Sequence, residues 1–488
     1  MKKIINRNII VFGLSFLSIY SCKKTNSNTQ SQPSPIVGTK PQANFTYFFF
    51  SNFGNIPDTV IFTSTSIDAI SYKWDFGDGN ISLAENPQHI YTAEGTYNVK
   101  LIVSNQYGAD SNTKSFAVIL KAPTANFNFT TSSLELMPVT ITCNNLTTGS
   151  NVSYLWSFGN GSTSTQLNPI NNYTSGGIYS IKLQASNSSG TDSMVKEIKI
   201  CPYNQAYKTF NNDNINLFAW EGDKVVILSR NNSLNRQTMF KWAHTMDSVY
   251  LYYKSCTGQD PILFTPYYYI NGRSTIADVA NTCGAGCGYL GWTGIELQNT
   301  YFDISYNAIN NNNQFDQALF YEFGRNFWLY PNQLAYKTND PVTTGYAVFM
   351  RFMAMEATHV NGAPFGSLSF TDFKNQVIGL IDLYLSNSSL TWANTLGVGQ
   401  GVPGGFGGGA DLFASFCFRL KRDYGGDAFV QNVWKKAGQR PTAVTTQDAV
   451  DNFFLASCAA ANRNLTSVFQ SWRWPLSTNA IASASQYP

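Results

Sequence analysis

The stretch Gln314–Tyr330, QFDQALFYEFGRNFWLY, decides how the C-terminal part of this chain is interpreted. Its apolar and aromatic residues predict one buried helix that ends at Pro331, because a proline cannot continue a helix. Tyr321 and Arg325 are four residues apart and therefore share one face of that helix, with Glu322 beside them. A carboxylate beside a guanidinium on a buried helix is the first candidate functional site in the sequence.

The spacing of these residues resembles the His-Glu-x-x-His motif of zinc peptidases. In that motif two histidines bind the metal and the glutamate serves as general base. Here Tyr321 and Arg325 stand at the two histidine positions, and only Glu322 is retained. Arginine does not give up its proton at any working pH, so it cannot bind zinc. The sequence therefore has the frame of a metallopeptidase without its metal ligands.

Residues 201–488 as a whole resemble the gluzincin type of metallopeptidase, especially families related to plant basic secretory proteins. Gly288–Leu297 stands where those proteins place the edge strand of the substrate cleft. Thr343–Met350 is similar to the Glu-Gly-Phe-Ala opening of the helix that supplies the third metal ligand, which puts Thr344 at the ligand position. The later helices of the family are matched by residues 410–413, 424–429, 448–450 and 465–469.

The resemblance implies a C-terminal α+β, zincin-like domain with a degenerate site. Glu322 is its candidate catalytic residue, and Tyr321, Arg325 and Thr344 are its candidate ligand-binding residues. Zinc is not expected as a cofactor, because threonine is a poor zinc ligand and a hydrolytic site needs about three protein ligands. The guanidinium of Arg325 is expected to replace the charge of the metal and to pair with Glu322 or with a carboxylate of a ligand.

Three interpretations of Glu322 remain open. It is a buried carboxylate neutralised by Arg325, or part of a cleft that still binds peptide or glycan, or the acid–base group of a hydrolase that needs no metal. A metal site rebuilt nearby would use Glu356 and His359, which are three residues apart on the second helix. The alternative is that Glu356 and His359 face solvent at the end of that helix.

Length and composition indicate an exported protein with several domains. The chain has 488 residues, enough for about three domains. Charged residues make up 12% and aromatic residues 15% of the chain, and the formal net charge is +3. The sequence has no basic run of the kind that indicates nucleic-acid binding.

The N-terminus is predicted to be a lipoprotein signal peptide, residues 1–21. A basic start precedes a short apolar stretch, and residues 18–22, Ser-Ile-Tyr-Ser-Cys, resemble a bacterial lipobox with Cys22 as the lipidated residue. The alternative is an ordinary cleaved signal with an incidental cysteine. Residues 22–40 are expected to form a flexible tether. The predicted localisation is the cell envelope, as an outer-membrane lipoprotein that is periplasmic or surface-exposed, with the lipid as its membrane contact.

An internal repeat follows the tether. Pro41–Phe45 recurs as Pro123–Phe127 and Trp74–Gly79 recurs as Trp156–Gly161, each shifted by the same 82 positions. Short alternating strands between turn residues indicate a small β-sandwich with a buried tryptophan in each copy. With its WDFGDG segment, the first copy resembles a PKD domain, an immunoglobulin-like module. We therefore predict PKD domains at 41–120 and 121–200 that act as spacers or contact proteins or glycans.

Two carboxylates of the first copy are candidates for calcium binding. Asp75 and Asp78 are hard oxygen donors of the kind that calcium prefers. The alternative is that both side chains accept hydrogen bonds within the turn that contains them. His89 is interpreted as a turn residue of the loop before Tyr91.

In the C-terminal domain, strands are expected before helices. Strands are predicted at Lys224–Leu228, Ser248–Tyr253 and Gly288–Leu297, and helices from residue 314 onward. Gly397–Gly409 is interpreted as a mobile loop over the cleft, because the segment lacks the ending of a phosphate loop. Trp472, Trp474 and Pro475 are expected in the core.

Without Cys22, seven cysteines remain, so at least one thiol is expected to stay free. Cys283 and Cys287 are not spaced as a redox or metal pair, and a structural role is expected for them, with Cys256 a plausible disulfide partner.

The sequence thus predicts a multidomain protein of two all-β immunoglobulin-like (PKD) sandwiches and one zincin-like α+β domain. Its expected function is to bind an extracellular peptide, protein or glycan without catalysis. The alternatives are an active hydrolase built around Glu322 and a structural envelope protein.

Overall fold

The computed structural model describes residues 38–50 and 56–488. The predicted signal peptide, Cys22 and most of the predicted tether lie outside the described residues. The chain divides into two compact units, Met1–Lys121 and Ala122–Pro488. None of the helices in the described part of the chain combines the length and apolar character needed to cross a lipid bilayer.

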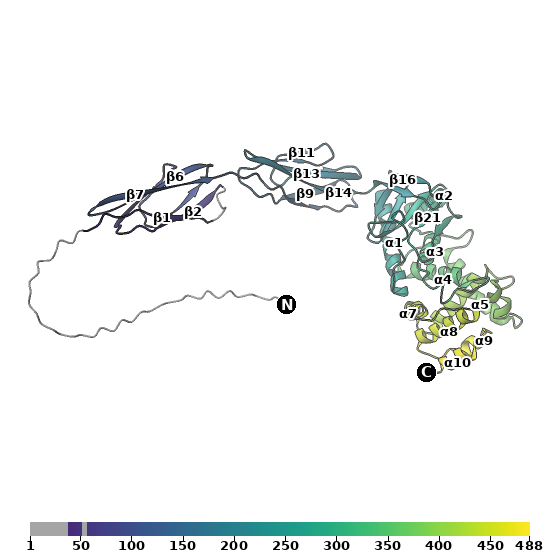
Figure 1. The fold of residues 1–488 in the computed structure, drawn as a ribbon. Helices are drawn as coiled ribbons and strands as arrows, with labels where there is room; N and C mark the ends of the chain where they lie inside the picture. Colours follow the sequence, from purple (N-terminus) through teal and green to yellow (C-terminus); the bar gives the residue numbers. More distant parts are fainter. Residues whose placement is uncertain (1–37, 51–55) are drawn as a thin grey trace, which may run out of the picture. The chain divides into compact units, whose positions relative to one another are not determined.

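The first unit contains a β-sandwich of two antiparallel sheets (Figure 1). Trp74 is fully buried between them, and its ring packs edge-on against Phe45 with centroids 5.0 Å apart. The hydroxyl of Tyr91 donates to the carbonyl of Phe76 at 2.9 Å. The sheets have the orders β1-β2-β5 and β4-β3-β6-β7, with β1 Phe45–Phe49, β2 Asp58–Ser64, β3 Ser71–Asp75, β4 Ile81–Ser82, β5 Gln88–Tyr91, β6 Gly95–Asn105 and β7 Gly108–Val118.

The second unit begins with a sandwich that repeats the first. Trp156 is fully buried against Phe127 at 5.0 Å, and Tyr173 donates to the carbonyl of Phe158 at 2.9 Å. The repeat in sequence is therefore a repeat of packing and of hydrogen bonding, which confirms the two predicted sandwiches. The sheets have the orders β12-β9-β8 and β11-β10-β13-β14, with β8 Phe127–Thr131, β9 Val139–Asn145, β10 Ser153–Ser157, β11 Thr163–Ser164, β12 Ile170–Tyr173, β13 Gly177–Asn187 and β14 Gly190–Ile200.

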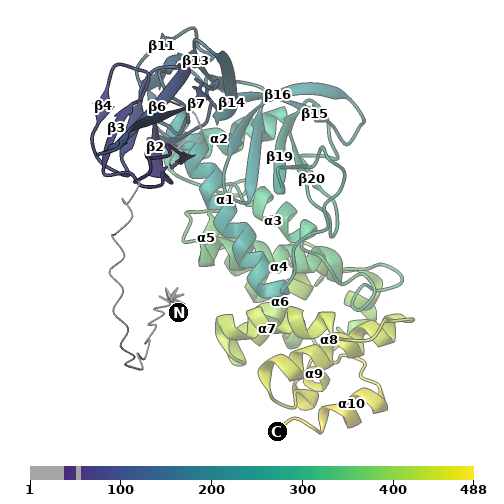
Figure 2. The same ribbon diagram turned by 60° about the vertical axis from the view of Figure 1, so that its left-hand side comes forward.

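The C-terminal domain starts with a mixed sheet of order β15-β16-β17-β19-β21-β20, to which β18 adds beside β19. Strands β17, β19 and β21 are parallel, and the antiparallel strand β20 forms one edge. Helix α1 packs on β16 and β17, and α2 and α3 pack on β21. Figure 2 shows α1 beside the sheet that contains β16 and β19. The strands are β15 Tyr203–Lys208, β16 Asn214–Glu221, β17 Val225–Ser229, β18 Tyr269–Ile270, β19 Arg273–Val279, β20 Gly286–Gly288 and β21 Ile295–Gln298.

The rest of this domain is helical and shares one hydrophobic core with the sheet. Helix α3 packs against α4, α4 against α6, and α7 against α8. Trp472 and Trp474 are buried in this core, as predicted. The helices are α1 Arg236–Thr257, α2 Asn299–Asn312, α3 Gln317–Asn326, α4 Val342–Ala357, α5 Phe370–Ser386, α6 Gly409–Asp423, α7 Gly426–Gly438, α8 Thr446–Ala461, α9 Thr466–Ser471 and α10 Thr478–Ala484.

One predicted strand is wrong. Ser248–Tyr253 lies inside α1, because its buried residues Val249, Tyr250 and Tyr253 continue a helical spacing that starts upstream. Asn235 caps the start of that helix and Gly258, with φ of 77°, ends it. The strand predicted at Lys224–Leu228 is confirmed as β17.

Two other boundaries differ from the prediction. The predicted strand Gly288–Leu297 is two strands, β20 and β21, separated by a turn in which Gly291 and Gly294 have φ of 78° and 103°. Helix α3 ends at Asn326, before Pro331, and the side-chain amide of Asn326 donates to the carbonyls of Tyr289 and Gly294 at 3.0 and 3.1 Å. The residues that follow α3 bury their aromatic rings without helical structure.

Candidate functional site

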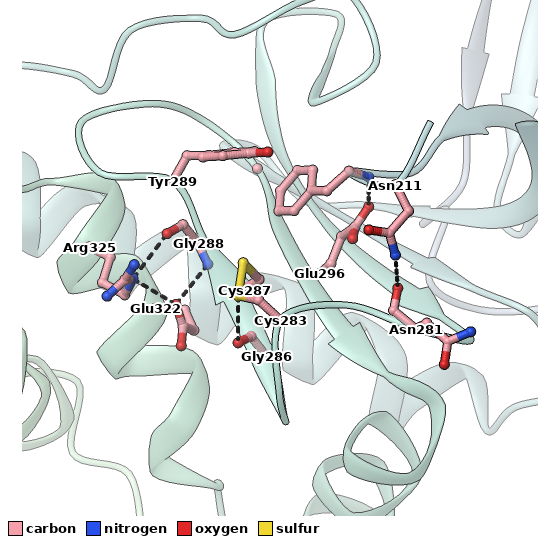
Figure 3. Close-up of a disulfide and its surroundings, with 12 residues drawn as sticks. Asn211, Asn281, Cys283, Gly286, Cys287, Gly288, Tyr289, Glu296, Glu322 and Arg325 are labelled. Atoms are coloured by element: carbon pink, nitrogen blue, oxygen red, sulfur yellow. Dashed lines mark hydrogen bonds and ion pairs between the residues drawn. A yellow bond between two sulfur atoms is a disulfide. The ribbon is translucent and has the colours of Figure 1, made fainter. Parts of the chain in front are cut away.

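The candidate site lies where α3 meets the edge strand β20. Glu322 projects from α3 and is only 7% exposed, because Phe320 and Phe323 on the same helix are fully buried and hold it against the sheet. One oxygen of its carboxylate, Oε2, accepts a hydrogen bond from the backbone N–H of Gly288 at 2.7 Å (Figure 3). The side chain of Glu322 is thus fixed to the edge of the sheet.

Arg325 completes this contact. Its Nε donates to the carbonyl oxygen of Gly288 at 3.0 Å and lies 3.3 Å from Oε2 of Glu322 (Figure 3). The ion pair predicted between Glu322 and Arg325 is therefore present. Together the two side chains occupy both the N–H and the C=O of Gly288.

The acidity of Glu322 is strongly perturbed. Burial raises the pKa of Glu322 from 4.5 to about 7, although the charge of Arg325 and the N–H of Gly288 both lower it. A carboxyl group with this pKa exchanges its proton near neutral pH.

Tyr321 and Thr344 are not joined to this pair. The ring of Tyr321 faces Arg351 of α4, whose guanidinium carbon is 5.8 Å from the ring centroid. Thr344 lies in the first turn of α4. Among the described residues, no hydrogen bond or ion pair links Tyr321 or Thr344 to Glu322 or Arg325. The structure therefore separates the four predicted site residues into one pair on Gly288 and two residues elsewhere.

The residues at the predicted metal position do not fit zinc. Tyrosine, arginine and threonine occupy the three ligand positions, and the guanidinium of Arg325 is engaged with Glu322 and Gly288. Within residues 38–50 and 56–488, no three His, Cys, Asp or Glu side chains form a group that could hold a metal ion.

Glu356 and His359 do not lie together on one helix, as a metal site built from both residues would require. Glu356 accepts hydrogen bonds from Lys374 and, at 3.0 Å, from Lys421. His359 lies beyond the end of α4, in the left-handed region with φ of 53°, and is exposed. The prediction that both residues lie on the helix is wrong, because α4 ends at Ala357.

In the first sandwich, Asp75 and Asp78 both accept hydrogen bonds from their own turn. Asp75 accepts from the N–H of Gly77 and Asp78 from the N–H of Asn80, each at 3.0 Å. Asp78 also lies 2.7 Å from Nε2 of His89. The turn placement expected for His89 is wrong, since it lies in β5 and stacks on Phe76.

A disulfide between Cys283 and Cys287 borders the site. Cys287 lies in β20, so the bridge ties the edge strand to the segment before it (Figure 3). The expected pairing with Cys256 is wrong, because Cys256 is buried in α1 as a free thiol. The other free thiols of the described residues, all buried, are Cys143, Cys201, Cys417 and Cys458.

An exposed aromatic surface next to Gly288 was not predicted. Tyr289 and Trp292, which follow β20, are 37% and 38% exposed, and both pack against Phe264, with ring centroids 4.9 and 5.2 Å away. Phe210 closes the cluster at 4.4 Å from Tyr289. We call Phe210, Phe264, Tyr289 and Trp292 the aromatic surface. Its members come from three separate loops, so no local sequence pattern signals it.

A buried carboxylate, that of Glu296, forms a hydrogen bond with the loop that carries Phe210 of the aromatic surface. Glu296 of β21 has no exposed area, and its Oε1 accepts from the N–H of Phe210 at 2.7 Å and from the hydroxyl of Tyr207 at 3.1 Å. Burial raises the pKa of Glu296 above its usual range. Asn211 also donates to the carbonyl of Asn281 at 3.0 Å (Figure 3). These bonds fix the loop that carries Phe210 to the sheet.

The glycine-rich segment packs against the start of α4 rather than standing free. Gly409 closely approaches Pro341, the residue before α4, and Gly399. Asp411 accepts from the N–H of Gly408 at 2.9 Å and so caps α6. This use of Asp411 agrees with the prediction that the segment is not a phosphate loop.

Comparison with known proteins agrees with the two sandwiches. The family model described as PKD domain matches residues 55–120 and 120–201. Collagenase ColQ1 of Bacillus cereus is 44% identical over 50 residues, which are 10% of this chain and 5% of the collagenase. The PKD1 domain of the Vibrio cholerae metalloprotease PrtV is 35% identical over 16% of this chain and 96% of that domain, with a TM-score of 0.15.

For the longer part of the chain the solved structures are distant. A metallopeptidase in complex with Tn antigen is 12% identical over 76% of this chain and 72% of its own, with a TM-score of 0.37. The chain spans only a small fraction of the curated relatives it matches, 5% of ColQ1 and 8% of PrtV. The family model therefore confirms the predicted tandem of PKD domains over residues 55–201. The structure confirms that a domain of strands and helices follows them.

Proposed function

We propose that residues 201–488 form a ligand-binding domain that has the frame of a metallopeptidase and does not hydrolyse its ligand. The observation that carries the proposal is the position of the Glu322 carboxylate. Its Oε2 is occupied by the N–H of Gly288 at 2.7 Å and by Arg325 at 3.3 Å. A positive charge beside a carboxylate weakens that carboxylate as a general base, and a guanidinium cannot serve as a zinc ligand. Arg325 therefore opposes both general-base catalysis and metal binding.

The ligand that we propose is an extracellular peptide or glycan. The aromatic surface supports this class, because exposed aromatic rings provide large contact area for a bound ligand at a low cost in conformational entropy. Tyr289 and Trp292 lie in the turn that follows the edge strand, where a ligand of a metallopeptidase-like cleft is expected. The two PKD domains would present this surface as spacers, and a lipid on Cys22 would hold the protein at the cell envelope. The PKD family match, together with short stretches similar to a collagenase and a metalloprotease, supports the coarser description, a protease-associated or binding protein.

Peptide and glycan arrays probed with the purified full chain test the proposal. We expect binding that is lost in the variants Tyr289→Ala and Trp292→Ala. The matched control is Tyr107→Ala, which removes a tyrosine that is 43% exposed on the first sandwich and should leave binding unchanged. Elemental analysis of the same protein should find no zinc. About one zinc per chain that is lost in Glu322→Gln would overturn the proposal.

A second candidate function is a hydrolase that uses no metal. It is favoured by the pKa of Glu322, which burial raises to about 7, a value suited to proton transfer at neutral pH. Assays of the full chain on peptide and glycoside substrates between pH 5 and pH 9 distinguish the two candidates. Turnover that depends on pH with a midpoint near 7 and disappears in Glu322→Gln would establish the hydrolase and reject the binding domain.

A further inference from the structure

Arg351 is a buried cation without a counter-ion. It lies in α4, is 9% exposed, and takes part in no hydrogen bond or ion pair with any described residue. Its Nε is fully buried and has no partner. Leaving a charged donor of this kind unsatisfied in a protein interior is costly, and the Nη groups of the same guanidinium also have no hydrogen-bond partner among the described residues. Arg351 therefore differs from Arg325, whose Nε is fully engaged.

Aromatic rings surround the guanidinium on its faces. Its central carbon lies 4.8 Å from the ring centroids of Phe352 and Phe373 and 5.8 Å from that of Tyr321. These contacts stabilise the positive charge over the rings, but they do not satisfy the N–H donors at the edge of the group. Phe352 and Phe373 are almost fully buried, whereas Tyr321 is partly exposed. Of the three rings around Arg351, that of Tyr321 is therefore the one that reaches solvent.

Two carboxylates act on Arg351 electrostatically, and both are used elsewhere. Asp316 accepts from the N–H of Ala318 at 2.7 Å and caps α3, and Asp411 accepts from the N–H of Gly408 at 2.9 Å and caps α6. Neither forms an ion pair with Arg351. Burial lowers the pKa of Arg351 to about 10, while the negative charges of Asp411 and Asp316 oppose that change. The group therefore stays protonated at neutral pH and keeps its donors free.

We propose that Arg351 binds a carboxylate group of the ligand, which enters beside Tyr321. The planar fork of a guanidinium matches a carboxylate in a bidentate arrangement. The negative potential of Asp316 and Asp411 disfavours a doubly charged phosphate more than a singly charged carboxylate. This inference rests on the proposed function, since it names a chemical group of the same ligand. The carboxylate belongs either to a peptide or to an acidic sugar.

The test measures thermal shifts of the full chain with two pairs of probes. N-acetylglycine is compared with N-acetylglycinamide, and glucuronate with glucose, so that each pair differs in the carboxylate. We expect one acid, and neither neutral partner, to raise the midpoint of unfolding in proportion to the logarithm of its concentration. A response to N-acetylglycine alone assigns a peptide carboxylate, and a response to glucuronate alone assigns an acidic sugar.

Three variants locate the effect. Arg351→Met should weaken the binding of the responding acid at least about tenfold, since charge-assisted hydrogen bonds contribute at this level. Arg351→Lys keeps the charge without the fork and should bind with intermediate affinity. Arg419→Met is the control, because Arg419 is a cation of α6 that is already paired with Asp382, and its loss should leave binding unchanged. Circular dichroism verifies that each variant is folded.

An equal response in wild type and Arg351→Met, or no response of wild type to either acid, would overturn the inference. A different result would reject the proposed function, so the two failures can be distinguished. Hydrolysis by the full chain would reject the binding domain and leave a carboxylate site at Arg351 standing. Array binding that persists without any response to the acids would reject the carboxylate site alone.

Discussion

Oε2 of Glu322 lies 2.7 Å from the backbone nitrogen of Gly288, a residue 34 positions earlier in the chain. The edge of a sheet normally offers unpaired N–H and C=O groups to which an extended peptide can add. At Gly288 both groups are taken by side chains of α3, Glu322 and Arg325. A peptide that paired with the end of β20 would have to displace them, so ligand contact by side chains of the neighbouring aromatic surface is favoured.

Replacement of Glu322 by glutamine should change how stability depends on pH. Burial raises the pKa of Glu322 from 4.5 to about 7, so the folded state favours the protonated carboxyl group. The stability that this group contributes is complete below pH 4.5 and is lost as the pH rises through about 7, by about 3 kcal/mol in total. Glu322→Gln should lack this loss, as measured by urea unfolding between pH 4 and pH 8. Asp223→Asn, at an exposed carboxylate of the same domain, is the control and should keep the wild-type dependence.

Removal of the Arg325 charge should shift that titration upward. Arg325 lowers the pKa of Glu322, so in Arg325→Met the pKa of Glu322 should rise above the wild-type value of about 7. The pH at which stability is lost should rise with it. Arg325→Lys retains a positive charge and should titrate close to wild type. An unchanged midpoint in Arg325→Met would show that the ion pair does not control the acidity of Glu322.

A methyl group at Gly288 should disrupt the contact between β20 and α3. A Cβ there would lie 2.8 Å from the backbone oxygen of Glu322 and 3.1 Å from its Oε2. Because a backbone atom cannot move aside cheaply, Gly288→Ala should destabilise the domain by about 1–3 kcal/mol in urea unfolding. Gly286→Ala, two residues earlier, is the control. Its Cβ would approach the end of the flexible Leu297 side chain at 3.0 Å, and a smaller loss is expected.

The buried tyrosine hydroxyl should contribute equally to the two sandwiches. Tyr91 and Tyr173 each donate to a backbone carbonyl at 2.9 Å and are each 1% exposed. Tyr91→Phe and Tyr173→Phe should therefore each cost about 1 kcal/mol of the free energy of unfolding. Tyr97→Phe removes an exposed hydroxyl bond to Ala93 and should cost less. A difference of more than about 1 kcal/mol between the two buried sites would contradict the equivalence of the repeats.

The sequence was most informative where the pattern is local. The WDFGDG segment and its copy predicted two sandwiches, because strand alternation and turn residues lie close together in each repeat. Ser248–Tyr253 was misread because valine and tyrosine favour strands, and the buried spacing that makes α1 a helix is visible only over a longer window. The Glu322 and Arg325 pair was predictable, since the two residues are one helical turn apart.

The remaining parts of the site depend on contacts between distant segments. Gly288 contacts Glu322 only when β20 packs against α3, and the rings that surround Arg351 include residues of α3 and α5. The aromatic surface likewise gathers residues from three loops. Contacts between segments that are distant in the sequence leave no periodic pattern along the chain. These features could therefore be found only in the three-dimensional structure.

The buried free thiols can be used to follow local unfolding of this protein, because each becomes accessible only when its surroundings unfold. Burial raises the pKa of Cys143, Cys201, Cys256 and Cys458 to about 11, so a thiol-directed label at neutral pH finds little thiolate and no access to sulfur. Labelling of a given cysteine therefore reports the local unfolding of the segment that contains it. The order of labelling, read by mass spectrometry, would rank the unfolding of the second sandwich, α1 and α8 in a single unmodified chain.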